Sequence, residues 1–590
     1  MQGLKSFYSD KITGLNKQLS GIKSQLLQSS IVRLVVFVLM IVGITLFYDT
    51  PKTVIAIVLF SIVLFLVIVS RHTNLQYKRD KILALLHINE TEIKILDRDF
   101  HEQPDGSEFK DPLHYFSQDI DLFGKGSFYQ YLNRTALPQG SERLASLFVA
   151  NEIIGIEEKQ QAIKELSQLP NWRQEFTAVA SLVKTETSYQ AIIAWVNEYQ
   201  GFLPKFMKYL PYIFWGISIV AILGYFIIPF SFFVVLAAFV VGLIISGFYV
   251  KSINKLSNDT GKIQTTFHQY QKLILEIEKV EFKTTLLKEK RAAILNEAEK
   301  TSAILKEFSK ILDALDQRNN MLFGVFANGL MLWDIYQSFK IESWITKNGA
   351  KIETWFDTIA FFDAYNSLAN FAFNHPKYKY PRLVASDVIL ESVEAGHPLL
   401  NPEKSVLNDI HIAREQFFII TGANMAGKST FLRTVSLQIV MANVGLPLCA
   451  KSVTYTPIKL ITSMRTTDSL TDDESYFFSE LKRLRFIVDE IKTDRYFIVL
   501  DEILKGTNST DKAVGSRKFV EKLIGGKATG IIATHDLSLC EAANDLPQVE
   551  NHYFDAEIIA DELHFDYKFK DGICQNMNAS FLLKKMQIVD

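Results

Sequence analysis

The 590-residue sequence contains few cysteines and almost no net charge, and both absences limit what the protein can be. Its three cysteines, Cys449, Cys540 and Cys574, lie far apart and form no Cys-x-x-Cys pair, so we predict neither a zinc site nor a disulfide framework. This usage fits a reducing compartment. The net charge of −2 neither favours nor excludes nucleic-acid binding, because a local basic groove can exist in a neutral chain. The sequence contains no internal repeat and no low-complexity segment.

Charged residues are also absent from long stretches of the chain. Residues 34–48 and 53–70 are two closely spaced apolar runs, and residues 209–250 contain no Asp, Glu, Lys or Arg. A spanning helix needs about 20 apolar residues, so the third run is long enough for two helices with a turn near Pro229. Buried core helices, or a signal peptide at the first run, are the alternatives, but a signal peptide is not followed at once by a second apolar segment. We therefore predict four transmembrane helices in two hairpins.

Basic residues flank both predicted hairpins on the same side of the membrane. They are Lys11, Lys17, Lys23, Arg33, Arg71, Lys78, Arg79, Lys81, Lys205, Lys208, Lys251 and Lys255. The connecting turns carry only Asp49 and Lys52. Because Lys and Arg are retained on the cytoplasmic side, we expect a multi-pass protein of the inner, or cytoplasmic, membrane. Both termini and all the large soluble parts are then expected in the cytoplasm.

A phosphate-binding loop is predicted in the C-terminal third of the chain. Residues 421–430 read Thr-Gly-Ala-Asn-Met-Ala-Gly-Lys-Ser-Thr, between an apolar strand at 417–420 and an expected helix at 431–444. Glycine lets such a loop turn tightly, and the start of the helix offers free N–H groups to a phosphate. We expect Lys428 to reach the β/γ-phosphates of ATP and the Ser429 hydroxyl to coordinate Mg²⁺. The residues expected to contact the nucleotide are Gly422, Ala423, Asn424, Met425, Ala426, Gly427, Lys428, Ser429 and Thr430.

Two further apolar strands end in residues suited to ATP hydrolysis. Residues 496–500 are fully apolar, as in a buried parallel strand, and are followed by Asp501 and Glu502. We expect Asp501 to hold the Mg²⁺ water shell, and Glu502 to orient and deprotonate the attacking water. A second strand at 530–534 leads into His535, which we expect to sense the γ-phosphate or to polarise the attacking water. A satisfied strand-end histidine is the alternative for His535.

These motifs resemble those of the MutS family of DNA mismatch-repair ATPases. Residues 422–430 resemble its Gly-Pro-Asn-Met-Gly-Gly-Lys-Ser-Thr loop, and residues 501–507 its Asp-Glu-Ile-Gly-Arg-Gly-Thr. Residues 533–535 match its Ala-Thr-His, and residues 475–480 are similar to its Ser-Thr-Phe-Met-x-Glu signature. In that family the signature serine reaches the γ-phosphate held by the other subunit of a dimer. The resemblance therefore implies a homodimer in which Ser475 acts in trans.

The resemblance extends to both sides of these motifs. His397 and the proline after it match the His-Pro that opens the family's ATPase domain, so His397 is assigned to nucleotide binding by resemblance. Residues 122–140 resemble the start of the family's helical core, and residues 362–369 its return helix. Residues 551–556 resemble the Asn-x-x-x-Asp-Ala near the end of the ATPase domain.

The chain also departs from the family pattern. Acidic residues at 472–474 replace the glycine before the signature serine, and residues 405–409 lack the aromatic residue that packs on adenine. We expect no N-terminal domain with the Phe-x-Glu wedge that reads mismatches, because Phe478-Ser479-Glu480 fits that pattern only by chance, within the signature segment.

The predicted fold combines an α/β P-loop ATPase domain of the ABC-superfamily, MutS type with an all-α helical core and four transmembrane helices. We divide the chain into an N-terminal segment with the first hairpin (1–75), a connector with the first part of the core (76–204), the second hairpin (205–250), a helical lever with the return of the core (251–385), and the ATPase domain (386–590). The proline-free run at 263–315 is expected to form a long lever or an antiparallel helical pair.

Three function classes fit these observations. The first is a membrane-anchored, MutS-like, Mg²⁺-dependent ATPase that dimerises and binds double-stranded or branched DNA. The second is the same ATPase acting on a protein or lipid partner without DNA. The third, an ABC-type transporter, is disfavoured because no Leu-Ser-Gly-Gly-Gln motif precedes Asp501. The sequence leaves the first two open.

Overall fold

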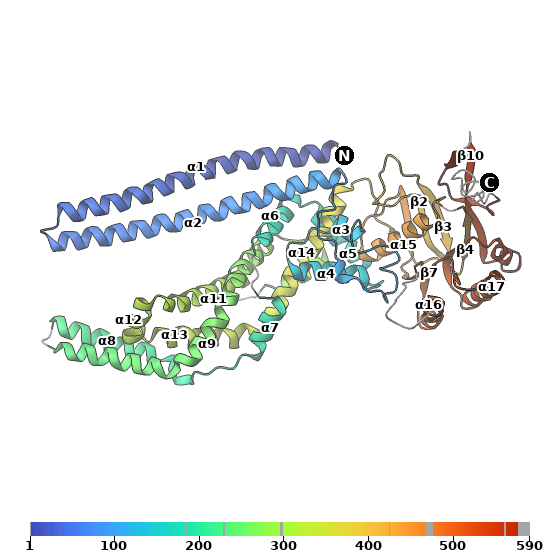
Figure 1. Cartoon of the computed structure of the whole chain (residues 1–590). Helices are drawn as coiled ribbons and strands as arrows, with labels where there is room; N and C mark the ends of the chain where they lie inside the picture. The colour runs from blue at the N-terminus through green and yellow to red at the C-terminus, as the bar shows by residue number, and fades with distance from the viewer. Residues whose placement is uncertain are drawn as a thin grey trace.

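The computed structural model describes residues 2–183, 187–227, 230–295, 299–423, 425–465, 476–559 and 562–575. Figure 1 shows an elongated molecule with a mixed α/β part at one end and two long helical hairpins that reach the other end. The hairpin helices are α1 (Gln2–Leu46), α2 (Pro51–Leu96), α8 (Leu210–Ile227) and α9 (Phe232–Glu278). Each is long and apolar enough to cross a membrane by length and composition.

The hairpin helices continue well beyond their apolar runs. α2 has no break at Arg71, and α9 none at Lys251, where the charged residues begin. From Lys251 to the end of α9 at Glu278 the helix extends about 40 Å, at 1.5 Å per residue. The predicted apolar runs are therefore the distal parts of longer rods, and these rods connect them to the rest of the molecule. The turn at Pro229 lies outside the described residues.

A helical core joins the hairpins to the α/β part. Its first helices are α3 (Phe128–Leu132), α4 (Pro138–Val149), α5 (Ile156–Ser167), α6 (Pro170–Ser181) and α7 (Tyr189–Glu198). After α9 follow α10 (Thr285–Ala292), α11 (Thr301–Asp316), α12 (Met321–Met331), α13 (Trp333–Asn348) and α14 (Ile352–Asn374). α14 is the central helix, buried along most of its length against α4, α5 and α6. α9 packs against α11, with the rings of Phe267 and Phe308 4.9 Å apart, so the run at 263–315 contains an antiparallel pair and not one long lever.

The α/β part contains two larger sheets and a small hairpin. Its strands are β1 (Arg382–Leu383), β2 (Val388–Ala395), β3 (Asn408–Ala413), β4 (Phe417–Gly422), β5 (Ser452–Tyr455), β6 (Lys459–Ser463), β7 (Tyr496–Asp501), β8 (Thr529–Ala533), β9 (Val549–Phe554), β10 (Ala556–Ile559), β11 (Glu562–Phe565) and β12 (Lys570–Asp571). Its helices are α15 (Lys428–Val444), α16 (Tyr476–Glu490), α17 (Ser509–Gly525) and α18 (Ala542–Asp545). Among the described residues the main sheet has the order β12-β9-β4-β8-β7-β6, with parallel pairing from β9 to β6.

Candidate nucleotide-binding site

The order of the main sheet brings the predicted site residues together. β4, β8 and β7 are parallel neighbours, and Ala533 at the end of β8 pairs with Ile420 on one side and Asp501 on the other. Because the carboxyl ends of parallel strands meet at one edge of a sheet, the loop after β4 faces the residues that follow β7 and β8. Lys428, Asp501, Glu502 and His535 therefore lie at the same edge.

The loop between β4 and α15 needs glycine at two positions. Gly422 and Gly427 have φ values of 146° and 110°, in the region that L-residues rarely adopt. A Cβ on Gly422 would lie 2.5 Å from the carbonyl oxygen of Phe554, so the neighbouring strand excludes any side chain there. α15 begins at Lys428, directly after Gly427, so the expected start of the helix at residue 431 was three residues late. Asn424 lies outside the described residues.

The other loop residues differ in exposure. Ala423 and Ala426 are buried, whereas Met425 is 76% exposed and has a positive φ of 68°. Ser429 and Thr430, on the first turn of α15, are both exposed. The backbone N–H groups of this first turn have no earlier helical carbonyl to bond, which makes this end of α15 suited to an anion.

The Lys428 side chain folds back over its own loop. Its Nζ donates hydrogen bonds to the carbonyl oxygens of Gly422 at 2.6 Å and Ala423 at 3.0 Å, and lies 3.4 Å from Nε2 of His535. Burial lowers the pKa of the Lys428 ammonium, and the nearby carboxylates of Asp501 and Glu502 oppose that shift. The positive charge is thus held over the centre of the loop.

Ser429 and Asp501 form a direct contact. The Ser429 hydroxyl donates to Oδ2 of Asp501 over 2.9 Å. Burial raises the pKa of the Asp501 carboxyl, while the bond from Ser429 lowers it. Hydroxyl and carboxylate oxygens are the protein ligands that Mg²⁺ prefers, and this cation usually keeps several waters and phosphate oxygens as further ligands. The pair therefore fits a Mg²⁺ ion bound together with a phosphate.

Glu502 and His535 form the second polar pair of the site. Oε1 of Glu502 lies 2.9 Å from Nε2 of His535, and this hydrogen bond lowers the pKa of Glu502 to about 2. Glu502 has a positive φ of 50°, which costs backbone energy for a residue with a Cβ. Its N–H donates to the Ala533 carbonyl at 2.9 Å, and this bond helps to hold the strained conformation. The sheet thus fixes the Glu502 backbone, and His535 fixes its carboxylate.

Glu480 connects α16 to the loop after Glu502. Its carboxylate accepts hydrogen bonds from the backbone N–H groups of Leu504 and Lys505, and burial raises its pKa. Gly506 packs so closely on Phe477 that a Cβ would lie 2.8 Å from the Cβ of Phe477. The segment that resembles the family signature is therefore attached to the loop that carries Glu502. Ser475 and the acidic residues at 472–474 lie outside the described residues.

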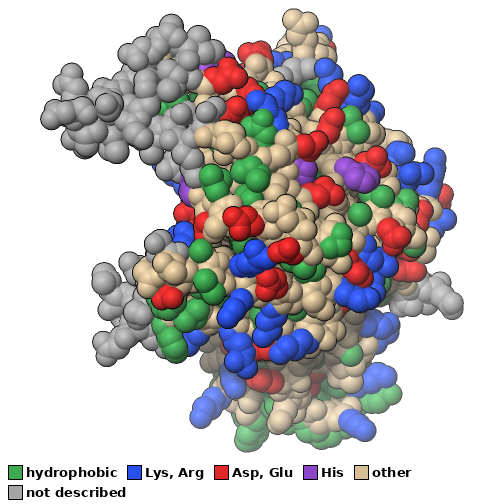
Figure 2. Space-filling view, turned by 90° about the vertical axis from the view of Figure 1, so that its right-hand side faces the viewer, with side chains coloured by type: hydrophobic (Ala, Val, Ile, Leu, Met, Phe, Trp, Pro, Cys, Tyr) green, Lys and Arg blue, Asp and Glu red, His purple; other side chains and the backbone are tan. Residues whose placement is uncertain are grey.

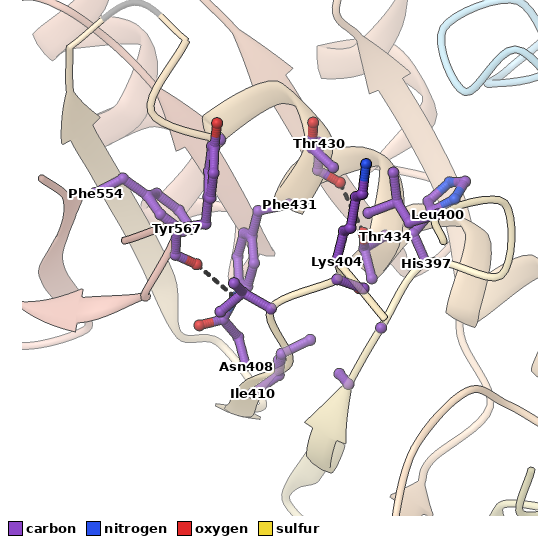
Figure 3. Close-up of a pocket in the computed structure, with 15 residues that line it drawn as sticks. His397, Leu400, Lys404, Asn408, Ile410, Thr430, Phe431, Thr434, Phe554 and Tyr567 are labelled. Atoms are coloured by element: carbon purple, nitrogen blue, oxygen red, sulfur yellow. Dashed lines mark hydrogen bonds between the residues drawn. The ribbon is translucent and has the colours of Figure 1, made fainter. Parts of the chain in front are cut away.

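A cavity of about 250 Å³ adjoins the phosphate loop. Figure 3 shows Phe554 and Tyr567 on one side of it, and His397 and Lys404 on the other. Gly427, Thr430, Phe431 and Thr434 line it from the side of α15. Burial, together with the charges of Arg433 and Arg98, lowers the pKa of His397 to about 4, so this half-buried imidazole is neutral at pH 7. The structure thus places His397 at the cavity beside the loop.

Tyr567 is a lining residue that the sequence analysis missed. Residues 405–409 contain no aromatic side chain, and the structure brings Tyr567 to this place from beyond β11. Asn408 anchors that segment: its Nδ2 donates to the Tyr567 carbonyl at 3.0 Å, and its Oδ1 accepts from the Phe569 N–H at 2.9 Å. No motif marks Tyr567, so only the folded chain reveals it.

Ion pairs connect the site to the beginning of the helical core. Asp121 forms two hydrogen bonds with the guanidinium of Arg465, at 2.6 and 2.7 Å, and lies 3.2 Å from Arg433 on α15. Asp119 accepts from the Arg465 N–H at 2.9 Å. The segment just before the core motif at 122–140 is thus tied both to the helix that follows the phosphate loop and to the chain beyond β6.

Comparison with known proteins supports the resemblance. The family model described as MutS domain V matches residues 418–586. The chain is 30% identical over 226 residues to the DNA mismatch repair protein MSH4 of Arabidopsis thaliana, an alignment that covers 38% of this chain and 28% of the relative. It is 31% identical over 235 residues to the human MutS protein homolog 4, covering 38% and 24%. It is 28% identical over 290 residues to the DNA mismatch repair protein MutS of Thermotoga petrophila, covering 48% and 35%.

The alignments cover only part of this chain and only part of each relative. The alignments span about a quarter to a third of the length of these curated relatives. The match to domain V begins inside β4 and takes in the phosphate loop, Asp501, Glu502 and His535.

Proposed function

The chain belongs to the MutS family, and we propose that it is a membrane-anchored ATPase that hydrolyses ATP to ADP and phosphate with Mg²⁺. The observation that carries this proposal is the meeting of two polar pairs beside the phosphate loop. Ser429 lies 2.9 Å from Asp501, and Glu502 lies 2.9 Å from His535.

Each residue of the site has a role in this proposal. Lys428 exchanges its bonds to the loop carbonyls for phosphate oxygens, because its ammonium already lies over the loop. Ser429 and Asp501 hold Mg²⁺, which neutralises charge on the phosphates. Glu502 orients the water that attacks the γ-phosphorus while the bond to the ADP oxygen breaks. The lowered pKa keeps the Glu502 carboxylate charged at pH 7, so it can orient the attacking water and accept its proton as the bond to phosphorus forms.

The cavity beside the loop suits the adenosine end of ATP. It is continuous with the loop through Gly427 and Thr430, and it offers the ring of Tyr567. Aromatic faces stack on nucleobases with little regard to base identity. His397 is neutral at pH 7 and can donate or accept a hydrogen bond there.

We propose that the active form is a homodimer. By resemblance to the family, Ser475 completes the site of a second subunit, and Glu480 attaches its segment to the Glu502 loop of its own subunit. Ser475→Ala should then bind ATP normally but hydrolyse it slowly. Mass measurement of the detergent-solubilised protein should show ATP-dependent dimers; a monomer that is fully active at every dilution would contradict this arrangement.

Membrane anchoring is proposed from the two hairpins. Their helices are long and apolar enough to span, exposed apolar side chains are concentrated in the distal parts, and both hairpins reach the same end of the molecule in Figure 1. The flanking lysines and arginines favour a cytoplasmic location for both termini and for the α/β part. The protein is thus proposed to be a multi-pass protein of the cytoplasmic membrane, with the domain divisions given above.

We propose that the partner on which this ATPase acts is double-stranded or branched DNA. The support comes from the relatives, two of which are named DNA mismatch repair proteins. Figure 2 shows the α/β end of the molecule, where the Lys and Arg side chains of the described residues are interspersed with Asp and Glu. DNA would then contact the helical core and the rods near the membrane, through phosphates and without base reading.

A protein or lipid target is the second candidate, and the hairpins favour it. In this chain both long arms end in apolar runs, which suit a bilayer better than a duplex. An ATPase coupled to such arms would change the arrangement of helices within the membrane.

One set of measurements separates these proposals. ATP binding, ATP hydrolysis and DNA binding are measured with the full-length protein in lipid nanodiscs, with duplex, mismatched and branched DNA at two salt concentrations. DNA contacts through phosphates should weaken with a log–log salt slope of about −0.9 per phosphate. Hydrolysis without binding to any DNA would support the second candidate. Failure of Lys428→Ala to reduce ATP binding would overturn the site itself.

A further inference from the structure

The short helix α12 (Met321–Met331) exposes an unusually apolar surface. No charged residue occurs between Arg318 and Asp334 in the sequence. Met321 is 81% exposed, Leu322 73% and Phe326 59%. A helix this short cannot span a bilayer, and it lies in the region that was expected to be wholly cytoplasmic. Contiguous exposed apolar side chains of this kind mark a surface that is covered by something other than water.

α12 packs closely on the apolar part of α9. A Cβ on Gly242 would lie 2.3 Å from the carbonyl oxygen of Gly329, and a Cβ on Gly329 would lie 2.3 Å from the ring of Phe239. The rings of Phe239 and Phe326 are 5.8 Å apart. Small residues that let two helices approach this closely are typical of helix packing within membranes.

The contact places α12 at the depth of the second hairpin. Phe239 and Gly242 lie between the turn that precedes Phe232 and the first charged residue of α9, Lys251. Phe239 is about 18 Å from Lys251 along the helix, at 1.5 Å per residue. Figure 1 accordingly draws α12 alongside α8 and the distal part of α9. If the second hairpin spans the membrane, α12 lies in the leaflet on the cytoplasmic side.

Several polar groups of α12 are hydrogen-bonded inside the protein. Asn328 donates from Nδ2 to the Gly324 carbonyl of the same helix at 2.9 Å and accepts from the N–H of Asp334, on α13, at 3.0 Å. The Trp215 indole of α8 donates to the carbonyl of Met331. These hydrogen bonds satisfy polar groups that would find no hydrogen-bond partner in hydrocarbon.

The cytoplasmic end of α12 is marked by aromatic and charged residues. The rings of Trp215 and Tyr336 lie 5.3 Å apart, and those of Tyr212 and Tyr336 5.5 Å apart. Arg318 forms a salt bridge of 2.8 Å with Asp334. Trp and Tyr gather at membrane–water interfaces, where their rings are partly apolar and partly polar. The boundary of the bilayer therefore lies near these residues.

We propose that α12 is a re-entrant helix that inserts into the cytoplasmic leaflet and contacts lipid acyl chains. This inference rests on the membrane anchoring given above and replaces the expectation that the segment 251–385, as one of the large soluble parts, lies wholly in the cytoplasm. Lipid is the occupant because the exposed face of α12 continues the exposed apolar surface of α8 and α9, which includes Val220 and Val240. α11 and α13, which precede and follow α12 in the chain, connect it to the helical core. The insertion of α12 therefore anchors this part of the core directly in the bilayer.

Cysteine labelling in native membranes tests the insertion. Single cysteines are introduced as Leu322→Cys and Phe326→Cys, with Val240→Cys as an intramembrane control. Leu83→Cys is the aqueous control, because Leu83 and Val240 are both 44% exposed but Leu83 lies beyond the apolar run of α2. A membrane-impermeant maleimide is added to inverted vesicles, and labelling of the unsubstituted protein is subtracted. A thiol reacts with maleimide as its thiolate, and a charged thiolate is unfavourable in hydrocarbon. The cysteines at positions 322 and 326 should therefore react at least about tenfold more slowly than the cysteine at position 83.

The outcomes distinguish this inference from the anchoring on which it rests. Fast labelling at 322 and 326 with protection at 240 would overturn the insertion of α12 and leave the hairpin in place. Fast labelling at 240 as well would refute the anchoring itself. Protection at 322 that disappears when the protein is diluted into excess lipid would identify a second copy as the occupant and overturn the lipid contact. ATP hydrolysis by each variant reports that it is folded.

Discussion

The site and the helical core hold one motif carboxylate each, and they do so in opposite ways. Glu502, at the edge of the main sheet, bonds to His535, and its pKa falls to about 2. Asp363, in the middle of α14, accepts from the backbone N–H groups of Leu137 at 2.9 Å and Ala136 at 3.1 Å, and burial raises its pKa to about 7. Both residues belong to motifs that resemble those of the family, yet one is held charged and the other is driven towards neutrality.

The difference shows what the two parts of the molecule require. A strand end leaves Glu502 beside an imidazole and partly exposed, which suits a group that must act on water. The core uses Asp363 to satisfy the N–H groups just before α4, where two helices are joined. Burial destabilises the charged form of Asp363 by more than the two amide hydrogen bonds stabilise it. A motif carboxylate is therefore catalytic or structural according to its neighbours.

The largest expected effect is the loss of ATP turnover when the Glu502 carboxylate is removed. Glu502→Gln should reduce ATP turnover by about 10²–10⁴-fold while ATP affinity stays unchanged, because the carboxylate positions water and does not hold phosphate. Turnover and nucleotide affinity are measured together in nanodiscs. Glu541→Gln, at an exposed carboxylate away from the site, is the control and should behave as the unsubstituted protein. Near-normal turnover in Glu502→Gln would remove Glu502 from its assigned role.

Asp363 gives the next largest effect, and it is a dependence on pH. The pKa is about 7 in the folded protein against 3.8 for the free side chain, so folding takes up a proton between these values. Stability from this group is therefore greatest at low pH and is lost as the pH rises from about 4 to 7, by up to about 1.4 kcal/mol per pH unit. Asp363→Asn keeps the shape without the charge and should flatten this part of the profile.

Thermal unfolding of the detergent-solubilised protein across pH 4–8 measures the Asp363 effect. The unsubstituted protein and Asp363→Asn are compared at each pH, so contributions from other groups cancel. Parallel profiles would mean that Asp363 is charged in the folded core, and the contrast with Glu502 would no longer hold.

The smallest expected effect concerns Tyr567. Tyr567→Ala should weaken ATP binding by about 1–3 kcal/mol, the usual contribution of an aromatic ring stacked on a base. Tyr567→Phe keeps the ring and should bind ATP almost normally. Affinity for inorganic triphosphate, which has no base, should be the same in all three proteins. An equal loss of ATP and triphosphate affinity would show that Tyr567 supports the loop and not the base.

The local parts of the site could be predicted from the sequence. The phosphate loop, the strand ending at Asp501 and the strand before His535 are contiguous segments with their own residue pattern, and the structure has β4, β7 and β8 there. The start of α15 was wrong by three residues, because the loop glycine at 427 adopts a positive φ and lets the helix begin at once.

Contacts between distant segments could not be predicted in this way. Motif residue Gly140 is an example: a Cβ there would lie 2.1 Å from Oδ2 of Asp363, on a helix more than 200 residues away. The sequence showed only that both residues belong to family-like motifs. Tyr567 reached the cavity for a similar reason, since Asn408 fixes its segment from another strand.

What the sequence determined by itself is therefore the set of segments: apolar runs long enough to span, a phosphate loop that leads to Lys428, and strands that are followed by Asp501, Glu502 and His535. These follow from local composition and spacing, which one stretch of chain contains in full. The tertiary structure decided which segments meet. The order of the sheet sets the 2.9 Å contact of Glu502 with His535, and the close packing of Gly242 on Gly329 brings α12 to α9. Such contacts depend on the packing of many side chains at once, and no single stretch of the sequence encodes them.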